Sequence, residues 1–305
     1  MFSDGAADKQ VSKKIMRKVE VALKTRANLG ECPRWDEKSQ KLYWVDINQF
    51  ELHCFDPATG EDSHLTFNEE IGCFALREGS DGFVLAMRNG LFLTDGWNTN
   101  LQKVCDPEEG KDKNRFNDGR CDAKGRLLAG SYYPPKDYDG ANFWSFEKAE
   151  ASLLIPGLLT ANGAAFSPDN TRFYHADTPK HKLFVSDYDL DSGVVSNTRI
   201  FREFEHGKGR PDGGSVDQDG FYWSALYEGS RIVRMNPQGD IVETIEIPAK
   251  CPTMCAFGGD DMRTLFITTV GNRPEEEFAD YPDAGSIFSV KVDVPGMHEH
   301  RFVSA

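Results

Sequence analysis

The chain has 305 residues, which at about 100–200 residues per domain allows two domains or one large one. Its 35 basic and 49 acidic residues give a net charge of −14, which disfavours nucleic acid and anionic membrane surfaces as partners. No run approaches the roughly 18 apolar residues of a membrane helix, and a hydrophobic content of 39% excludes disorder over most of the chain.

The seven cysteines indicate a reducing environment. Their number is odd, no CxxC pair occurs, and a chain of this size folds without disulfides. The first 18 residues include basic residues but lack the apolar run of a signal peptide. We therefore expect residues 1–18 to form a flexible tail and the protein to be cytoplasmic.

A polar turn followed by a short, aromatic-rich strand recurs six times along the chain. The segments are residues 36–47, 78–87, 122–132, 167–178, 217–227 and 258–270. One apolar residue marks each strand, namely Leu42, Phe83, Leu127, Phe173, Phe221 and Leu265. The steps between successive markers are 41, 44, 46, 48 and 44 residues. Further strands are expected at 89–95, 181–189, 230–240 and 285–293.

Six units of about 50 residues, rich in short strands and lacking a helical apolar stripe, are typical of a β-propeller. We therefore predict an all-β fold in which residues 19–305 form a single six-bladed β-propeller domain. The strand at 19–25 is expected to pair with the last blade and close the ring, which removes the open edges of a linear sheet array. A β-sandwich, or two unrelated β-domains, is the alternative that the even spacing disfavours.

Four polar residues occupy a similar position in four different repeats. Glu31, Asn117 and Asn162 precede their markers by 11, 10 and 11 residues, and Asp212 precedes its marker by 9. In a ring of blades, equal phase brings such side chains together on the central axis. Two carboxylates that converge there need a cation, and an all-oxygen set suits Ca²⁺, Mg²⁺ or Mn²⁺, with Zn²⁺ and Fe²⁺ as further alternatives. Asn-Gly and Asp-Gly are also common turn dipeptides, so the shared phase alone distinguishes this set from ordinary turns.

The segments around these residues resemble the SMP-30/gluconolactonase/luciferin-regenerating enzyme (regucalcin-like) family of six-bladed propellers, and bacterial sugar lactonases in particular. LGECPRWD resembles the family's LGEGPxWD, with Cys32 in place of glycine. NRFNDGRCDAKGRLLAGSY resembles its RxNDGxxDxxGRxxxGTM. Three further segments also match, TANGAAFSPDNTRFYHADT, RPDGGSVDQDGFYWSAL and CAFGGDDMRTLFITT, so the resemblance covers about residues 19–293.

The resemblance implies one divalent metal ion on the axis, most simply Ca²⁺, held by Glu31, Asn162 and Asp212. It also implies that Asn117 lies beside metal and substrate, and that Arg115 hydrogen-bonds substrate oxygens. The implied activity is that of a carboxylic ester hydrolase that opens a sugar lactone to the aldonic acid. In this reaction the metal polarises the carbonyl group and Asp212 activates water. The implied partner is a small molecule, bound by a monomer or a small homo-oligomer.

The chain departs from the family where some members carry an acidic sugar-binding residue. Here the segment reads GSYYPPKDYDGANFW, and Tyr132 and Tyr133 either contact the sugar or pack between blades. His175 either faces the channel or lies in the core. Two other functions remain open, a non-enzymatic Ca²⁺-binding or interaction propeller and a hydrolase of organophosphate or aryl esters. The pairing of Arg115 with Asn117 favours an enzyme, because an ion buffer needs no substrate clamp.

Overall fold

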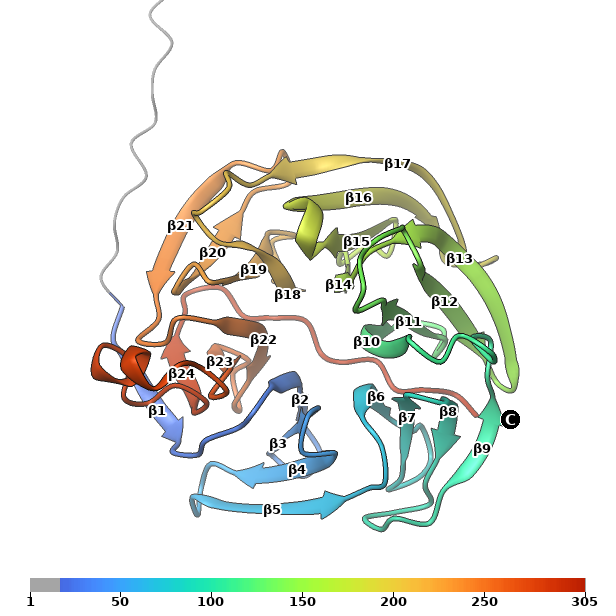
Figure 1. Ribbon diagram of the computed structural model, residues 1–305, viewed down its shortest axis with the longest axis horizontal. Helices are drawn as coiled ribbons and strands as arrows, with labels where there is room; N and C mark the ends of the chain where they lie inside the picture. The colour runs from blue at the N-terminus through green and yellow to red at the C-terminus, as the bar shows by residue number, and fades with distance from the viewer. Residues whose placement is uncertain (1–16, 305) are drawn as a thin grey trace, which may run out of the picture.

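In the computed structural model, which describes residues 17–304, six four-stranded antiparallel sheets surround a central axis (Figure 1). Five sheets are simple meanders of consecutive strands, and the sixth has the order β1-β24-β23-β22. The prediction of an all-β, six-bladed propeller is confirmed. Apart from Arg17 and Lys18, the predicted tail lies outside the described residues.

The strands run outward from the axis within each blade. Blades 1 and 2 comprise β2 (Gly30–Asp36), β3 (Lys41–Asp46), β4 (Glu51–Asp56), β5 (Glu61–Thr66), β6 (Ile71–Leu76), β7 (Phe83–Met87), β8 (Gly90–Leu93) and β9 (Gln102–Cys105). Blades 3 and 4 comprise β10 (Arg115–Cys121), β11 (Leu127–Tyr132), β12 (Ala141–Glu147), β13 (Glu150–Leu158), β14 (Ala161–Phe166), β15 (Arg172–Asp177), β16 (Lys182–Asp189) and β17 (Val194–Glu203). Blades 5 and 6 comprise β18 (Arg210–Val216), β19 (Tyr222–Tyr227), β20 (Arg231–Met235), β21 (Ile241–Glu246), β22 (Pro252–Gly258), β23 (Thr264–Thr269), β24 (Ile287–Lys291) and β1 (Val19–Leu23). Two short 3₁₀ helices, Thr178–Lys180 and Glu275–Ala279, complete the described elements.

The ring is closed by the first strand. β1 pairs antiparallel with β24, with Val19 opposite Val290 and Val21 opposite Phe288. The predicted closure is therefore confirmed. Because β1 supplies the outer strand of blade 6, the two ends of the repeat array are held in one sheet, and the edge of β24 that would otherwise attract another strand is covered.

The turns that open the repeats are built by side-chain acceptors. The Asp122 carboxylate accepts hydrogen bonds from the backbone N–H groups of Lys124 and Arg126, both at 2.9 Å. One predicted marker is displaced by a residue: Tyr222, and not Phe221, pairs with Val216 across the turn of blade 5. The turns of blades 3 and 5 have the same length, and Phe221 occupies the last turn position, as Arg126 does in blade 3. The predicted marker is displaced because the turn of blade 5 ends in an aromatic residue.

Apolar side chains fill the space between neighbouring blades. Four clusters of buried residues each combine side chains from adjacent blades, and Trp44 and Trp223 are among the largest fully buried residues. The seven cysteines are all free, and five of them are buried. Across residues 17–304, no helix is long and apolar enough to cross a membrane.

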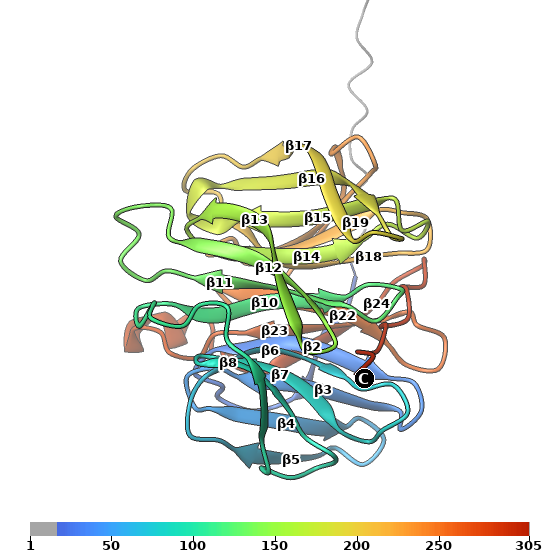
Figure 2. The same cartoon turned by 90° about the vertical axis from the view of Figure 1, so that its right-hand side faces the viewer.

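After β24 the chain crosses one end of the central channel (Figures 1 and 2). The Glu299 carboxylate lies 3.9 Å from Arg34 and 3.5 Å from Arg120. Farther along, Phe302 is fully buried, and its backbone N–H donates to the carbonyl of Leu76 at 2.8 Å. This C-terminal segment therefore links the walls of several blades at the end of the channel that Arg34 faces.

We expect Phe302→Ala to lower the free energy of unfolding by about 3 kcal/mol, because it removes a fully buried aromatic ring and leaves a cavity. Val303→Ala is the matched control, since this neighbour is 42% exposed, and an exposed site of this kind usually changes stability by less than about 0.5 kcal/mol. Denaturant unfolding of both variants measures the difference. Equal effects would show that the C-terminal segment does not contribute to the packing of the ring.

Candidate functional site

Every innermost strand carries a β-bulge near its start, at the same level of the channel. In β2, the three-residue step from Glu31 to Arg34 lies opposite the two-residue step from Val45 to Tyr43, so β2 holds one extra residue. β6, β10, β14, β18 and β22 show the same irregularity. A bulge bends the strand locally and redirects its side chains. The four polar residues predicted from their phase lie at the bulges of β2, β10, β14 and β18.

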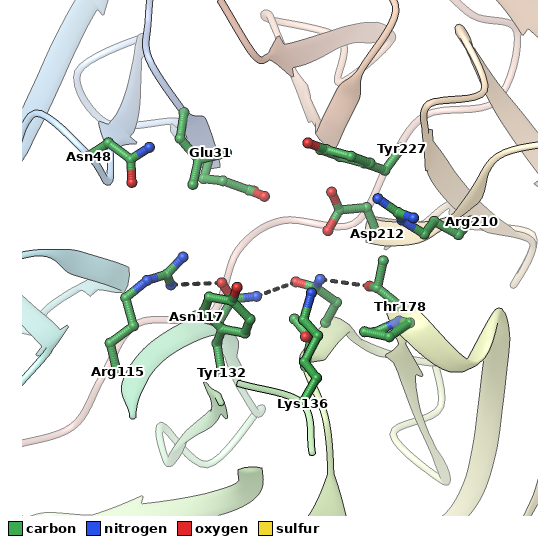
Figure 3. Close-up of a pocket in the computed structure, with 14 residues that line it drawn as sticks. Glu31, Asn48, Arg115, Asn117, Tyr132, Lys136, Thr178, Arg210, Asp212 and Tyr227 are labelled. Carbon is green, nitrogen blue, oxygen red and sulfur yellow. Dashed lines mark hydrogen bonds between the residues drawn. The ribbon is translucent and has the colours of Figure 1, made fainter. Parts of the chain in front are cut away.

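These bulges surround a pocket of about 320 Å³ at one end of the channel (Figure 3). Its fourteen lining residues are Leu29, Glu31, Asn48, Arg115, Asn117, Tyr132, Lys136, Thr160, Asn162, Thr178, Pro179, Arg210, Asp212 and Tyr227. Six of the seven predicted site residues are therefore brought together by the fold, although their positions span 182 residues of sequence from the first to the last.

A chain of hydrogen bonds crosses the pocket floor from blade 3 to blade 5. Arg115 Nη1 donates to Asn117 Oδ1 at 2.8 Å, and Asn117 Nδ2 donates to Asn162 Oδ1 at 2.6 Å. Asn162 Nδ2 donates in turn to the Thr178 hydroxyl at 2.8 Å, which donates to the carbonyl of Pro211 at 2.7 Å. The chain links the three blades through buried polar groups.

The donor-to-acceptor direction along this chain of hydrogen bonds determines the orientation of the side-chain amides of Asn117 and Asn162. A guanidinium can only donate and a carbonyl can only accept, so the two ends determine every donor between them. Asn162 must turn its nitrogen to Thr178 and its oxygen to Asn117, and the remaining lone pair of that oxygen is available to a ligand in the pocket. Asn162 is thus held as an acceptor beside the two carboxylates.

Glu31 and Asp212 are buried carboxylates, 7% and 5% exposed. Burial, followed by the charges of Asp212 and Asp118, raises the pKa of Glu31 well above its usual range. Burial, followed by the charge of Asp118, raises the pKa of Asp212 in the same way. Neither forms an ion pair with a cationic side chain among residues 17–304: the nearby Arg210 pairs with Glu228 at 3.1 Å instead.

This donor set fits a divalent cation. Two buried carboxylates without a cationic partner and one oriented amide oxygen are hard oxygen ligands, and Glu31, Asp212 and Asn162 would hold the ion. Among the described residues no group of three or more His, Cys, Asp or Glu side chains could hold a metal ion. The set is consistent with that finding, because its third member is an asparagine.

The structure separates the two tyrosines. Tyr132, the last residue of β11, lines the pocket, and its ring centroid lies 4.9 Å from the guanidinium carbon of Arg115. Tyr133 does not line the pocket: it is 4% exposed, its hydroxyl donates to Asp137 at 2.7 Å, and its ring packs on Tyr138. The geometry gives no support to a substrate contact by Tyr133.

Six lining residues with polar side chains were not predicted from the sequence, namely Asn48, Lys136, Thr160, Thr178, Arg210 and Tyr227. Lys136 lies in a loop, Thr178 begins the 3₁₀ helix Thr178–Lys180, and Arg210 and Tyr227 lie at strand ends. Arg210 and Tyr227 are direct partners across β18 and β19. Arg210 starts its inner strand as Arg115 starts β10, so a comparison of strand starts offered a signal for Arg210. Loop residues such as Lys136 do not recur at a fixed position in the repeats, so the repeat pattern gives no signal for them.

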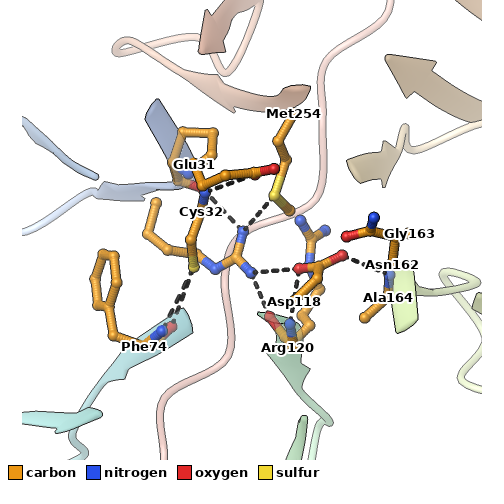
Figure 4. A network of polar contacts seen from close by, with 12 residues as sticks. Glu31, Cys32, Phe74, Asp118, Arg120, Asn162, Gly163, Ala164 and Met254 are labelled. Carbon is orange, nitrogen blue, oxygen red and sulfur yellow. Dashed lines mark hydrogen bonds and ion pairs between the residues drawn. The ribbon is translucent and has the colours of Figure 1, made fainter. Parts of the chain in front are cut away.

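A second buried network lies below the pocket (Figure 4). Arg34 is 2% exposed, contacts Asp118 at 3.9 Å and donates to the carbonyl groups of Pro33 and Gly119. Asp118 also accepts a hydrogen bond from the backbone N–H of Ala164 at 3.0 Å. This network ties blades 1, 3 and 4 together beneath Glu31 and Asn162.

His175 is a core residue and does not line the pocket. It is 1% exposed and its ring stacks on Phe173 and Phe184, at centroid distances of 5.9 and 5.0 Å. Burial lowers the pKa of His175 to about 3. The core alternative that the sequence left open is the one that the structure supports.

A sequence model described as the SMP-30/Gluconolactonase/LRE-like region matches residues 29–271. The chain belongs to this family. The 6-deoxy-6-sulfogluconolactonase of Pseudomonas putida is 43% identical over 278 residues, which cover 90% of this chain and 94% of the relative. The L-arabinolactonase of Azospirillum brasilense is 32% identical, with 91% and 93% covered. Both relatives are lactonases, the class of carboxylic ester hydrolase that the sequence predicts.

A solved structure supports the same family at the level of the fold. The calcium-binding protein regucalcin from Agrobacterium tumefaciens superposes with a TM-score of 0.91 at 25% identity, covering 96% of this chain and 99% of that one. The predicted family resemblance is therefore confirmed, and this structural relative is described as calcium-binding.

In metal-free protein we expect Asp212→Asn to raise the free energy of unfolding by about 2 kcal/mol, because the substitution removes a buried charge that has no cationic partner. Asp118→Asn is the matched control: it weakens the contact with buried Arg34 and is expected to lower stability by a similar amount. Denaturant unfolding in the presence of a chelator measures both. A loss of stability in Asp212→Asn would show that its charge is already compensated without metal.

Below pH 6.5, we expect His175 to make the protein less stable as the pH falls. The unfolded chain binds a proton near the ordinary histidine pKa of 6.5, whereas the folded chain does so only near about 3. The free energy of unfolding thus loses about 1.4 kcal/mol per pH unit between these values. His175→Phe is expected to remove this slope, and His298→Phe, at an exposed side chain, to keep it. Unfolding curves at several pH values test this, and an unchanged slope in His175→Phe would contradict it.

Proposed function

We propose that this protein hydrolyses a sugar lactone to the corresponding aldonic acid in the pocket formed by blades 1, 3, 4 and 5. The observation that carries the proposal is the convergence of Glu31, Asn162 and Asp212 beside Arg115 and Asn117 in one pocket. Two relatives named as lactonases, each covered over more than nine-tenths of its length, support the same reaction class.

The pocket suits a small polyhydroxylated ring. Arg115 keeps donors that its bond to Asn117 does not use, and its planar fork can hold two neighbouring oxygens of a sugar. The Tyr132 ring, which lies against Arg115, offers a flat face to the ring carbons and a hydroxyl to the sugar. Asn117 fixes the guanidinium, and it is itself fixed by its bonds to Asn162 and to the carbonyl of Ala161.

Asp212 is placed to handle the proton of the reaction. The Asp212 carboxylate lines the pocket and would accept a proton from the water that attacks the lactone carbonyl carbon. The bond from that carbon to the ring oxygen then breaks, and Asp212 returns the proton to the leaving oxygen. The product acid ionises at neutral pH, so each turnover releases one proton to the solution.

A divalent cation held by Glu31, Asn162 and Asp212 would polarise the carbonyl group and stabilise the negative charge that develops on its oxygen. We propose Ca²⁺ as the first ion to test, because carboxylate and amide oxygens are its usual ligands. The regucalcin relative described as calcium-binding supports this choice. The free cysteines support the proposal that the protein works in a reducing compartment such as the cytoplasm.

A pH-drop assay on a panel of pentono- and hexonolactones, with chelator and after addition of Ca²⁺, Mg²⁺, Mn²⁺ or Zn²⁺, tests the proposal. We expect metal-dependent hydrolysis of at least one lactone. Asp212→Asn is expected to lower kcat at least about a hundredfold, the scale of a lost general base. Phenyl acetate and paraoxon in the same assay test the aryl ester and organophosphate alternatives.

The matched pair Arg115→Lys and Arg199→Lys tests the substrate clamp. Arg115→Lys keeps the charge but loses the planar fork, so we expect KM to rise by about tenfold, the value of one charged hydrogen bond. Arg199 lies on β17, outside the pocket, and its substitution is expected to leave the kinetics unchanged. If no lactone is hydrolysed faster than in the buffer blank with any of the metals, the proposed function is wrong.

A further inference from the structure

The mouth of the pocket carries more positive charge than a neutral sugar requires. Lys136 lies in the loop between β11 and β12, and Arg210 is the first residue of β18. Both line the pocket, and Figure 3 shows them reaching toward it from different blades. With Arg115, they bring three cationic side chains to a pocket that has two carboxylates, Glu31 and Asp212.

Lys136 has no anionic partner to explain its position. It forms no ion pair among the described residues, and its ammonium nitrogen lies 5.3 Å from the centroid of the Tyr132 ring. Burial and then the positive charge of Arg210 lower the pKa of Lys136, and the charge of Asp177 opposes this shift. Lysine side chains at a solvent-exposed loop would normally turn away from a neighbouring cation.

Arg210 is held in place by contacts on its far side. Its guanidinium pairs with Glu228 at 3.1 Å and lies 4.9 Å from the centroid of the Tyr227 ring. Glu228 does not line the pocket, so it anchors Arg210 without placing negative charge in the cavity. The aromatic supports of the two cations, Tyr132 and Tyr227, are both lining residues, and they restrict the cations to the mouth.

A divalent cation bound in the pocket would increase its excess of positive charge. It would neutralise Glu31 and Asp212. Arg115 and Lys136 would then have no anionic partner in the pocket, whereas Arg210 keeps its pair with Glu228 outside it. Hydroxyl groups of a neutral sugar satisfy the hydrogen bonds of such cations but not their charge. An anionic group within hydrogen-bond distance of Lys136 and Arg210 compensates both, and charge-assisted contacts of this kind are about twice as strong as neutral ones.

We propose that Lys136 and Arg210 form an anion-binding subsite that selects lactones carrying a sulfonate, phosphate or carboxylate substituent on the part of the sugar remote from the lactone carbonyl. The proposal rests on the proposed lactonase function, because it assigns the orientation of the substrate in the same pocket. The carbonyl lies among Glu31, Asn162 and Asp212, and the anionic substituent lies at the mouth.

The test compares 6-deoxy-6-sulfogluconolactone and 6-phosphogluconolactone with uncharged glucono-1,5-lactone. We expect the wild-type protein to prefer a charged lactone in kcat/KM. In Lys136→Met, the ratio of kcat/KM for that lactone over the uncharged one is expected to fall about tenfold, the value of one charged contact. Lys136→Arg keeps the charge and is expected to keep most of the ratio. The two charged substrates distinguish a sulfonate from a phosphate subsite.

Lys148→Met is the matched control, because Lys148 is exposed in the turn between β12 and β13 and lies outside the pocket. It is expected to leave the ratio unchanged. The preference for the charged lactone is also expected to weaken as NaCl is raised from 20 to 500 mM, because salt screens exposed charges over about 10 Å at 0.1 M. An equal loss for charged and uncharged lactones in Lys136→Met would overturn the proposal.

A binding measurement separates this proposal from the proposed function. Calorimetric titration with 6-deoxy-6-sulfogluconate and with gluconate compares two acids that differ only at C6, where a sulfonate replaces the hydroxyl group, and it requires no turnover. Tighter binding of the sulfonated acid that is lost in Lys136→Met supports the subsite even if no lactone is hydrolysed. Equal binding of the two acids by the wild-type protein, together with no preference among the three lactones, overturns the subsite while leaving a neutral-sugar lactonase intact.

Discussion

The closure of the ring is the constraint on which the site depends. Glu31 belongs to the first complete blade and Asp212 to the fifth, and they face the same pocket only because β1 joins β24 in the last sheet. The apolar surfaces between blades then set the angle of each sheet. No blade holds more than a part of the pocket, so the site forms only together with the complete ring and is lost with it.

The closed ring imposes an electrostatic cost at its centre. It brings together two buried carboxylates that form no ion pair among residues 17–304, and burial followed by neighbouring negative charges raises their pKa values. The hydrogen-bonded chain through Asn117 and Asn162 orients dipoles around them but supplies no charge. Below the pocket, the buried Arg34 pairs with Asp118 and not with these two carboxylates. This pair of carboxylates without an ion-pair partner is the physical reason to propose a metal ion there.

The two ends of the channel differ in how their charged side chains are compensated. One end is closed by the C-terminal segment, where Glu299 meets Arg34 and Arg120 and the charges are compensated within the chain. At the other end Lys136 and Arg210 leave positive charge facing solvent. Under the proposed function, a substrate would enter at this open end, so selectivity for a charged substituent would arise at the mouth and the reaction would take place at the bulges below it.

The all-β class, the six-fold repeat, the closing strand and the phase of four polar residues could be predicted from the sequence, because turn residues and strand periodicity are local properties. The four residues are Glu31, Asn117, Asn162 and Asp212. The sequence could not place Tyr133 outside the pocket or His175 in the core, since neighbouring residues of a strand differ only in the face they present. Lys136 lies in a loop with no periodic neighbour, and its meeting with Arg210 depends on how blades 3 and 5 are set around the axis. Only the tertiary structure decided which charges are compensated, because the partners of a buried charge come from blades that are distant in the chain.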